Sequence, residues 1–207
     1  MAIRAVVFDV GGVLERVEDL DAWLGRWRDR LGMQVDDFEA ALGRVDPRGA
    51  IGTGGVSEAE HRKGFRDALG LTEADADEFL ANMWDWYCGE LDEELVGYVA
   101  GLRPAYKTGI LSNSADGARR EEQRRYGFEQ LVDTIVYSHE VGLAKPDPRI
   151  YALTCERLGV QPEEMVFLDN DVATIVESAR AFGIQAVRHE NTPNSIAAIE
   201  AILAAHI

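Results

Sequence analysis

The sequence predicts an α/β fold, a Rossmann-like parallel sheet with helices on both faces, plus an inserted all-helical cap. Residues 5–8 form an uninterrupted apolar run of the kind found in buried parallel strands. From residue 106 onward, strand-like and helix-like patterns alternate, whereas the stretch between these regions has helical spacing only. We therefore expect a core domain made of residues 1–14 and 103–207 and a helical cap domain made of residues 15–102.

Composition limits the classes of partner. The 207 residues are 46% hydrophobic, enough for a packed core, and carry a formal net charge of −16. This acidity argues against nucleic-acid binding, which depends on clustered Lys and Arg. There is no apolar run near the ~18 residues of a membrane helix and no signal-peptide pattern. Cys88 and Cys155 have neither pairing nor metal-ligand spacing. We expect a cytoplasmic protein, a monomer or homodimer, that binds neither nucleic acid nor membranes.

The first strand leads into a polar turn. Asp9 follows the strand directly, and Gly11 and Gly12 come next. In open α/β sheets ligands bind outside the carboxyl ends of the strands, so a carboxylate at this position faces a ligand. The glycines allow the following backbone to approach whatever Asp9 faces. Taken alone, the stretch also fits a strand followed by a tight turn.

The cap is predicted to consist of short helices. Ser57 and Glu60 form a capping box, and Thr72 is placed to cap the next helix. Residues 45–56, which include Pro47, are predicted to form a loop because they are rich in glycine. Helices are expected at residues 20–31, 35–42, 57–70, 73–87 and 91–102. Three aromatic residues are expected to pack between helices, with a role in shaping a pocket as the alternative: Trp84, Trp86 and Tyr87.

The second part of the core is predicted to alternate strands and helices. Asp147 and Pro148 resemble an N-cap followed by Pro at the first helical position, and Thr192 with Pro193 begins the terminal helix. Helices are expected at residues 115–126 and 148–158. A further helix is expected to end at residue 182, and the terminal helix to begin at residue 192. Strands are expected at residues 106–112, 131–138, 165–168 and 185–188.

The polar residues at the strand ends predict a single site, because parallel strands bring their carboxyl ends to one edge of the sheet. Two facing carboxylates repel each other unless they are neutralised, and Mg²⁺ is a hard cation that prefers oxygen ligands. With Lys145 and the Ser112 hydroxyl, such a site would bind a dianionic phosphate, and Asp9 could attack phosphorus to form an aspartyl-phosphate. Each residue alone also has a purely structural explanation. The converging residues are Asp9, Ser112, Asn113, Lys145, Asp169 and Asp171.

Four motifs together resemble those of the haloacid dehalogenase-like hydrolase superfamily. They are FDVGGVL, ILSNS, GLAKPDPRIY and VFLDND, in this order. The resemblance covers residues 1–14 and about 103–207. The inserted segment is similar to the small α-helical cap of the subfamily I phosphatases. Bacterial sugar-phosphate phosphatases and the N-terminal phosphatase-like domain of epoxide hydrolases look most similar.

The resemblance implies a role for each matching residue. Asp9 would be the nucleophile and, with the Gly11 carbonyl and Asp169, a ligand of Mg²⁺. Lys145 would neutralise the nucleophile and the phosphate. The cap would select a small phosphorylated metabolite, for example a sugar phosphate. The other substrate-binding positions would be Ser112, Asn113 and Gly12.

The sequence departs from the family pattern at three places. Gly11 stands where family phosphatases usually carry a second Asp, the general acid and base, which is worth ~10²–10⁴ in rate. Glu15 or a residue of the cap could replace it. Val13 stands in place of the usual Thr.

In the fourth motif, counting from Phe167 favours Asp169 as the metal ligand, whereas counting back from Gly183 favours Asn170 and Asp171, because one extra residue lies between these two anchors. We favour Asp169, which directly follows the strand, with Asp171 as the second choice.

Two other functions fit the sequence. A metal-independent 2-haloacid dehalogenase shares the fold and also lacks the second Asp, but Arg28, Arg30 or Arg44 would have to bind halide or carboxylate. A non-catalytic binding protein would explain Gly11, but not the retained charged cluster. The favoured function is a Mg²⁺-dependent phosphatase.

Overall fold

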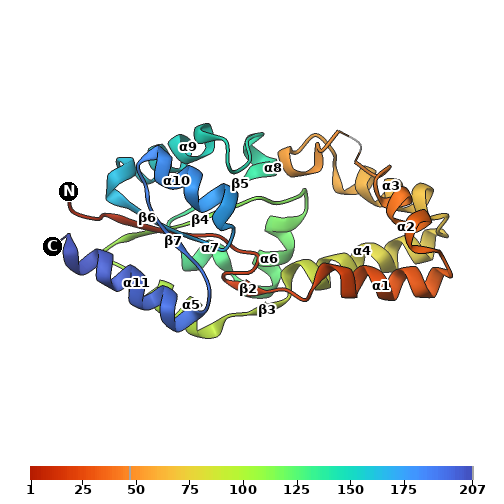
Figure 1. Cartoon of the computed structure of the whole chain (residues 1–207), viewed down its shortest axis with the longest axis horizontal. Helices are drawn as coiled ribbons and strands as arrows, with labels where there is room; N and C mark the ends of the chain where they lie inside the picture. The colour runs from red at the N-terminus through yellow and green to blue at the C-terminus, as the bar shows by residue number, and fades with distance from the viewer. Residues whose placement is uncertain (47, 207) are drawn as a thin grey trace.

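The computed structural model describes residues 1–46 and 48–206, apart from the side chain of Val172, and confirms the predicted α/β fold. A parallel five-stranded sheet has the strand order β5-β4-β1-β6-β7, and its carboxyl ends point toward the cap (Figure 1). The strands of this sheet are β1 (Ala5–Phe8), β4 (Lys107–Ser112), β5 (Thr134–Tyr137), β6 (Met165–Asp169) and β7 (Gln185–Arg188).

Both faces of the sheet are buried, which explains the continuous apolar run of β1. Val6 and Phe8 belong to one hydrophobic cluster, whereas Ala5 and Val7 belong to the cluster on the other face. The first face is covered by α5 (Glu93–Gly101), α7 (Phe128–Leu131) and α11 (Thr192–Ala205). The second face is covered by α9 (Pro148–Leu158) and α10 (Glu177–Phe182). The other helices of the core are α6 (Ala118–Tyr126), α8 (Ser138–Val141) and the 3-10 turn η2 (Pro162–Glu164).

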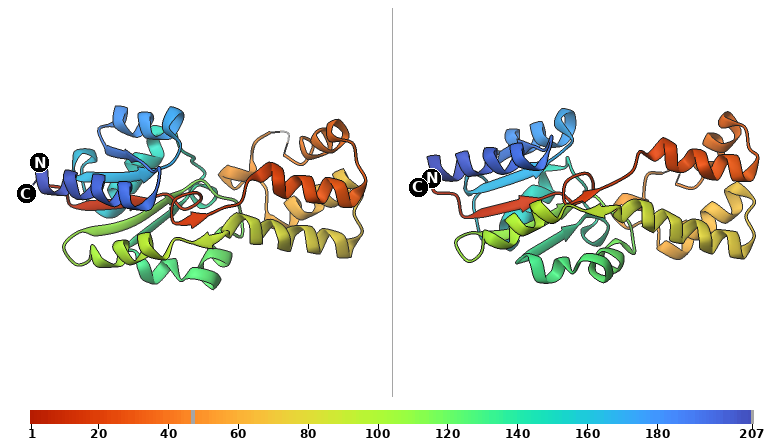
Figure 2. Two further views of the ribbon diagram at one scale, coloured as in Figure 1. Left: turned by 60° about the horizontal axis from the view of Figure 1, so that its bottom comes forward. Right: turned by 90° about the horizontal axis from the view of Figure 1, so that it is seen from below.

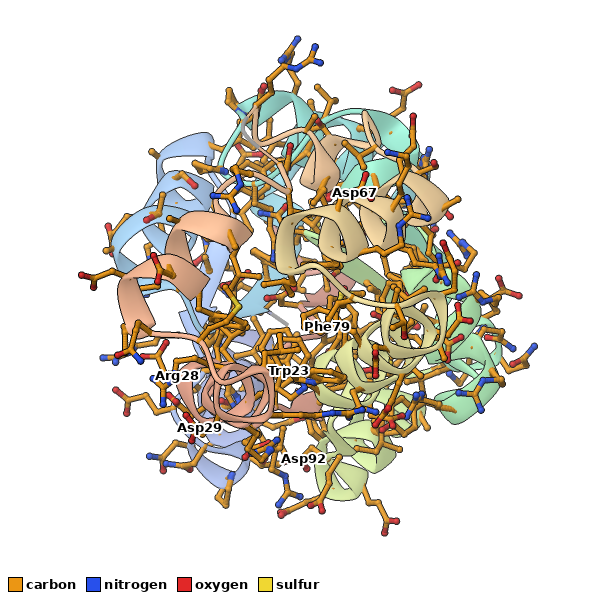
Figure 3. All side chains as sticks on the ribbon, turned by 90° about the vertical axis from the view of Figure 1, so that its right-hand side faces the viewer. Trp23, Arg28, Asp29, Asp67, Phe79 and Asp92 are labelled. Atoms are coloured by element: carbon orange, nitrogen blue, oxygen red, sulfur yellow. The ribbon has the colours of Figure 1, made fainter. Side chains whose placement is uncertain are left out.

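The cap has a hydrophobic core of its own, built from aromatic side chains. Trp23, Trp27 and Phe65 all lie with their ring centroids within 5.3 Å of the Phe79 ring. Figure 3 shows Trp23 and Phe79 in the interior of this unit. Its elements are α1 (Leu20–Leu31), α2 (Val35–Leu42), the 3-10 turn η1 (Ile51–Thr53), α3 (Glu58–Leu69) and α4 (Glu73–Cys88).

The chain passes between core and cap through a two-stranded antiparallel ribbon. Its strands are β2 (Glu15–Arg16) and β3 (Glu90–Leu91), and both lie at the junction in every view (Figures 1 and 2). The inserted segment is therefore not purely helical. Helix α5 packs its Leu95 and Val99 into the core cluster. The domain boundary at residue 102 remains a prediction, and this packing favours a boundary nearer to β3.

Several helix ends follow the sequence signals. Ser57 and Glu60 form the capping box of α3, and Thr72 caps α4. Asp147 caps α9 with Pro148 at its first position. The expected loop at residues 45–56 contains η1, and Pro47 lies outside the described residues.

Some predicted boundaries were wrong for local reasons. The helix expected from residue 91 begins at Glu93, because Leu91 pairs with Glu15 in the ribbon and Asp92 is the N-cap. The strand expected from residue 131 begins at Thr134, since residues 128–131 form a helical turn. The helix expected from residue 115 begins at Ala118.

Candidate active site

Three neighbouring strands bring the predicted polar residues to one edge of the sheet. Ser112 ends β4 and Asp169 ends β6, on either side of β1, and Asp9 follows β1 with its amide donating to the Leu168 carbonyl over 2.9 Å. Lys145 reaches the same place from the loop before α9. The structure thus brings together side chains from segments that are widely separated in the sequence.

Lys145 lies between the two carboxylates. Its Nζ is 2.8 Å from Oδ1 of Asp9 and 2.6 Å from Oδ2 of Asp169, and all three residues are buried. Burial works to lower the pKa of Lys145, but the two carboxylates outweigh it and raise that pKa. Burial raises the pKa of Asp9 to about 6, with Lys145 opposing the shift and Asp169 adding to it. One ammonium group therefore serves two carboxylates, which leaves a net negative charge.

Asn113 holds the Lys145 loop in place. Its Nδ2 donates to the Lys145 carbonyl over 2.9 Å, and its Oδ1 accepts from the Lys145 amide over 2.8 Å. Both ends of the amide are therefore used on the backbone of one residue. We propose that Asn113 acts by positioning Lys145 as well as lining the site. The Ser112 hydroxyl donates to the Asn113 carbonyl over a long 3.4 Å, so this weak contact leaves it available for a ligand.

Gly11 and Gly12 differ in whether the surrounding structure could accept a larger residue. Gly12 has a φ of 74°, and a Cβ there would lie 2.2 Å from Nδ2 of Asn170. A Cβ on Gly11 would meet nothing within 4 Å. The backbone of Glu15 brackets Gly11, because it accepts from the Gly12 amide over 2.7 Å and donates to the Val10 carbonyl over 3.0 Å. Position 11 therefore has room for a side chain such as the Asp that family phosphatases usually carry there.

Asp171 contacts the Lys145 cluster through its backbone amide, which donates to Oδ1 of Asp169 over 2.9 Å, while its side chain points to a different partner. It is exposed, and its carboxylate accepts from the Thr174 amide over 3.1 Å, where it caps the π-helical turn η3 (Val172–Val176). A π-helical turn holds one residue more than an α-helical turn, and such turns are frequent at functional sites. This accounts for the extra residue that made the sequence count ambiguous. We propose Asp169 as the metal ligand and Asp171 as the cap of this turn.

The donors at this edge fit Mg²⁺, which binds through one or two carboxylates and keeps several waters. Asp9 and Asp169 supply carboxylates, and in the described part of the chain no hydrogen bond is donated to the Gly11 carbonyl. Within residues 1–46 and 48–206, no group of three or more His, Cys, Asp or Glu side chains could hold a metal ion. An all-protein cage, such as a structural zinc site would need, is therefore not found among these residues.

A buried polar cluster beside the site was not predicted. Glu15 and Glu122 are fully buried, and the Tyr137 hydroxyl donates to Oε2 of Glu122. Among the described residues, both oxygens of Glu15, Oε1 of Glu122 and Nε of Arg125 lack a partner in hydrogen-bond geometry. Burial, and then the Glu122 carboxyl, raises the pKa of Glu15 to about 10. Burial also raises the pKa of Glu122 to about 8, against the hydrogen bond from Tyr137.

The sequence carried little sign of this cluster. Glu122 lies in α6, whose residues are almost all charged or polar, so nothing distinguished it from its solvated neighbours. Glu15 stood out only by its place directly after the first motif. Buried polar groups without partners call for an explanation, and this cluster lies beside the site where a side chain is missing at Gly11.

Comparison with known proteins identifies the family. The profile of the haloacid dehalogenase-like hydrolases matches residues 3–183. The chain therefore belongs to the haloacid dehalogenase-like hydrolase family.

The relatives that this chain resembles have different activities. A phosphatase from Mycobacterium tuberculosis is 29% identical over 90% of this chain and 87% of its own length. Bifunctional epoxide hydrolase 2 of Sus scrofa is 28% identical over 98% of this chain, and (S)-2-haloacid dehalogenase 1 of Pseudomonas is 34% identical over 46%. The matches span only 39% and 42% of those two relatives' own lengths.

A solved structure shares the fold. An enzyme of the same family from Bacteroides thetaiotaomicron, in complex with magnesium and inorganic phosphate, has a TM-score of 0.78 and 21% identity. The superposition covers 91% of this chain and 95% of that one. Within residues 1–46 and 48–206, no helix has the length and apolar character needed to span a membrane.

Proposed function

We propose that this protein is a Mg²⁺-dependent phosphatase that hydrolyses a small phosphorylated metabolite, such as a sugar phosphate, through an aspartyl-phosphate at Asp9. The observation that carries the proposal is the buried cluster in which Lys145 lies 2.8 Å from Asp9 and 2.6 Å from Asp169. A dianionic substrate needs positive charge at this edge, and one lysine between two carboxylates supplies too little. Bound Mg²⁺ would supply the missing charge and polarise the phosphoryl oxygens.

The proposed reaction has two steps. A carboxylate oxygen of Asp9 attacks phosphorus, the bond from phosphorus to the ester oxygen breaks, and the leaving oxygen takes a proton. Water then attacks the phosphorus of the aspartyl-phosphate, the bond to Asp9 breaks, and inorganic phosphate leaves. Lys145 and the Ser112 hydroxyl hold the phosphoryl oxygens and keep Asp9 in position. Asn113 fixes the loop that carries Lys145.

The cap is proposed to select the substrate and to exclude water when it closes on this edge. Residues 1–14 and 103–207 form the catalytic core in this proposal, and the cap lies within residues 15–102. The phosphatase relative, which matches nearly the whole chain, supports this assignment.

Phosphate release from p-nitrophenyl phosphate tests the proposal. We expect turnover with Mg²⁺, at least a hundredfold loss after chelation by EDTA, and recovery when Mg²⁺ is added back. Asp9→Asn removes the nucleophile and should abolish turnover. Asp171→Asn is the matched control, since only the Asp171 backbone contacts the cluster and its carboxylate accepts from the Thr174 amide, and it should retain most of the activity. Turnover that persists in Asp9→Asn, or none in the wild type, would contradict the proposal.

A 2-haloacid dehalogenase is the second candidate, favoured by Gly11 and by the dehalogenase relative. The arginines that such an enzyme would need are occupied within the cap. Arg28 binds Asp29 over 2.7 Å, and Figure 3 shows both at the periphery of the cap. Arg30 binds Glu78, and Arg44 donates to the Ala40 and Ala68 carbonyls. Chloride release from 2-chloropropionate without metal would support this candidate.

A further inference from the structure

A cavity lies at the edge of the sheet opposite the candidate active site. Its volume is about 690 Å³, within the range of pockets that bind small molecules. It opens where β1, β4 and β5 begin, and the last residues of α9 line one side. Both chain termini lie at this end of the core, away from the cap (Figure 1). The length of the sheet therefore separates this cavity from Asp9 and Lys145.

The cavity gathers positive charge in a strongly acidic chain. The formal net charge of the whole chain is −16. Of the described residues that line the cavity, four have cationic side chains and one has a carboxylate: Arg4, Arg103, Lys107, Arg157 and Asp133. Like charges held in one place repel each other, so this arrangement favours a bound anion.

Direct contacts hold three of these cationic residues together. The Lys107 amide donates to the Arg4 carbonyl over 2.9 Å, which sets the two residues side by side. Nζ of Lys107 donates to the Leu158 carbonyl over 2.5 Å, next to Arg157 at the end of α9. The guanidinium of Arg157 donates to the Ile135 carbonyl over 3.3 Å. Segments that are distant in the sequence thus bring their cations to one cavity.

Two of the four cations keep an uncompensated charge. Arg103 pairs with Asp133 over 2.6 Å, and Arg4 pairs over 3.1 Å with a carboxylate outside the cavity lining. Lys107 and Arg157 donate to backbone carbonyls, and within residues 1–46 and 48–206 neither forms a salt bridge. A neutral carbonyl orients a cation but cancels none of its charge. The cavity therefore offers two positive charges, enough to balance a dianion.

We infer that this cavity is a second anion site, which binds a phosphorylated small molecule carrying at least two negative charges. Lysine and arginine are the side chains that proteins use to bind phosphate, and a guanidinium can hold two phosphate oxygens at once. Beside the cations, an apolar wall suits the organic part of such a ligand: it consists of Ile3, Pro104 and the half-buried Tyr106. The site shares no residue with the Asp9 cluster and does not depend on the proposed phosphatase function.

Isothermal titration calorimetry of the full chain in EDTA tests the inference. The probes are inorganic pyrophosphate and ADP, which carries the same anionic group on an organic moiety. We expect saturable binding of both, with ADP the tighter. The double variant Lys107→Gln/Arg157→Gln removes the two uncompensated charges and should weaken the binding of both probes at least about tenfold.

Arg180→Gln is the matched control for this variant. Nε of Arg180 donates to the Ala186 carbonyl of β7 over 3.0 Å, much as Arg157 donates to a carbonyl of β5, but Arg180 does not line the cavity. It should bind both probes as the wild type does.

Hydrogen–deuterium exchange locates the bound probe and separates lost binding from misfolding. We expect pyrophosphate to slow exchange at residues 103–108 and 132–135 of the wild type and to leave residues 9–15 unchanged. Without the probe, the double variant should exchange as the wild type does. Protection only at the Asp9 edge, equal affinity of wild type and double variant, or no saturable binding would overturn the inference. Since no part of the test needs turnover, its failure is distinguishable from a failure of the proposed function.

Discussion

At the scale of single residues, two adjacent glycines have different physical reasons to be glycine. Gly12 needs its left-handed backbone, with φ 74°, and the space that Asn170 leaves, whereas Gly11 has neither restriction. Gly12→Ala should therefore lower the free energy of unfolding by about 1–2 kcal/mol, the cost of a side chain in this conformation. Gly11→Ala should change it by less than about 0.5 kcal/mol. Thermal denaturation of both variants measures the difference, and equal shifts would contradict it.

Glu122 makes stability depend on pH. Its pKa is raised by burial from 4.5 to about 8 in the folded protein. The folded state therefore holds this proton more tightly than the unfolded state does. Its contribution to stability is present below pH 4.5 and is lost as pH rises through about 8.

Glu122→Gln removes this titration, so the loss of stability between pH 5 and pH 9 should become smaller than in the wild type. The effect is on the order of a few kcal/mol, because each pKa unit corresponds to about 1.4 kcal/mol. Urea denaturation at the two pH values measures it. Glu177→Gln, at a surface ion pair with Arg180, should keep the wild-type pH dependence. A Glu122→Gln variant with the wild-type slope would show that Glu122 is already ionised at pH 5.

At the scale of secondary-structure elements, the sequence was most informative where a local signal sets the conformation. The capping box at Ser57 and the Asp147–Pro148 pair marked helix starts that the structure confirms. The register and pairing of strands were harder to predict from the sequence, because they depend on partners that are distant in the sequence. The β2–β3 ribbon pairs Glu15 with Leu91, and two-residue strands carry no periodicity to detect. The π-helical turn after β6 likewise hid the register of the fourth motif.

The same distinction applies to the candidate site. Motif residues at strand ends could be predicted because a parallel sheet fixes where those ends meet. The Tyr137–Glu122 pair could not, because it joins the end of β5 to a polar helix of the core and neither segment shows a motif. The sequence placed Tyr87 among helix-packing aromatic residues. Trp84 does pack in the cap cluster, and Trp86 and Tyr87 pack against it, as expected.

One contact joins the elements of cap and core. Glu58, at the start of α3, accepts from Nε1 of Trp84 over 2.7 Å and makes two hydrogen bonds with the guanidinium of Arg120 in α6, at 3.0 Å and 2.7 Å. The Glu58 amide donates to Asp116 over 2.8 Å. These bonds hold the start of α3 against α4 and against α6 of the core, and we expect them to favour closure of the cap over the sheet edge.

Glu58→Ala removes the side-chain part of this contact and should reduce the closed population. Because apparent affinity falls with the fraction of competent protein, we expect KM to rise several-fold with a smaller change in kcat. Glu177→Ala breaks a surface ion pair of 2.8 Å within the core and is the control, with unchanged KM. Steady-state kinetics on p-nitrophenyl phosphate measures both. An unchanged KM in Glu58→Ala would mean that this contact does not limit closure.

At the scale of the whole molecule, the cap and the core have hydrophobic clusters of their own, and they also meet where Ala118 of α6 packs in the cap cluster and where Arg120 pairs with Glu58. The aromatic cluster around Phe79 lies in the cap, and the two clusters that sandwich the sheet lie in the core. Both connections run through the β2–β3 ribbon. Glu15, at the start of that ribbon, also brackets Gly11, so a movement of the cap is coupled mechanically to the backbone of the first motif.

Gly89 controls this junction. Its φ is 54°, and a Cβ there would lie 2.3 Å from the Arg16 carbonyl oxygen on the opposite connection. Gly89→Ala should therefore force the two connections apart, displace β2, and lower both stability and turnover. Gly97→Ala is the matched control, since Gly97 lies inside α5 and a Cβ at that position would meet no atom within 4 Å. It should stabilise the helix by up to about 1 kcal/mol. Thermal denaturation combined with phosphatase kinetics distinguishes the two, and a Gly89→Ala variant with wild-type kcat would show that the site tolerates movement of the ribbon.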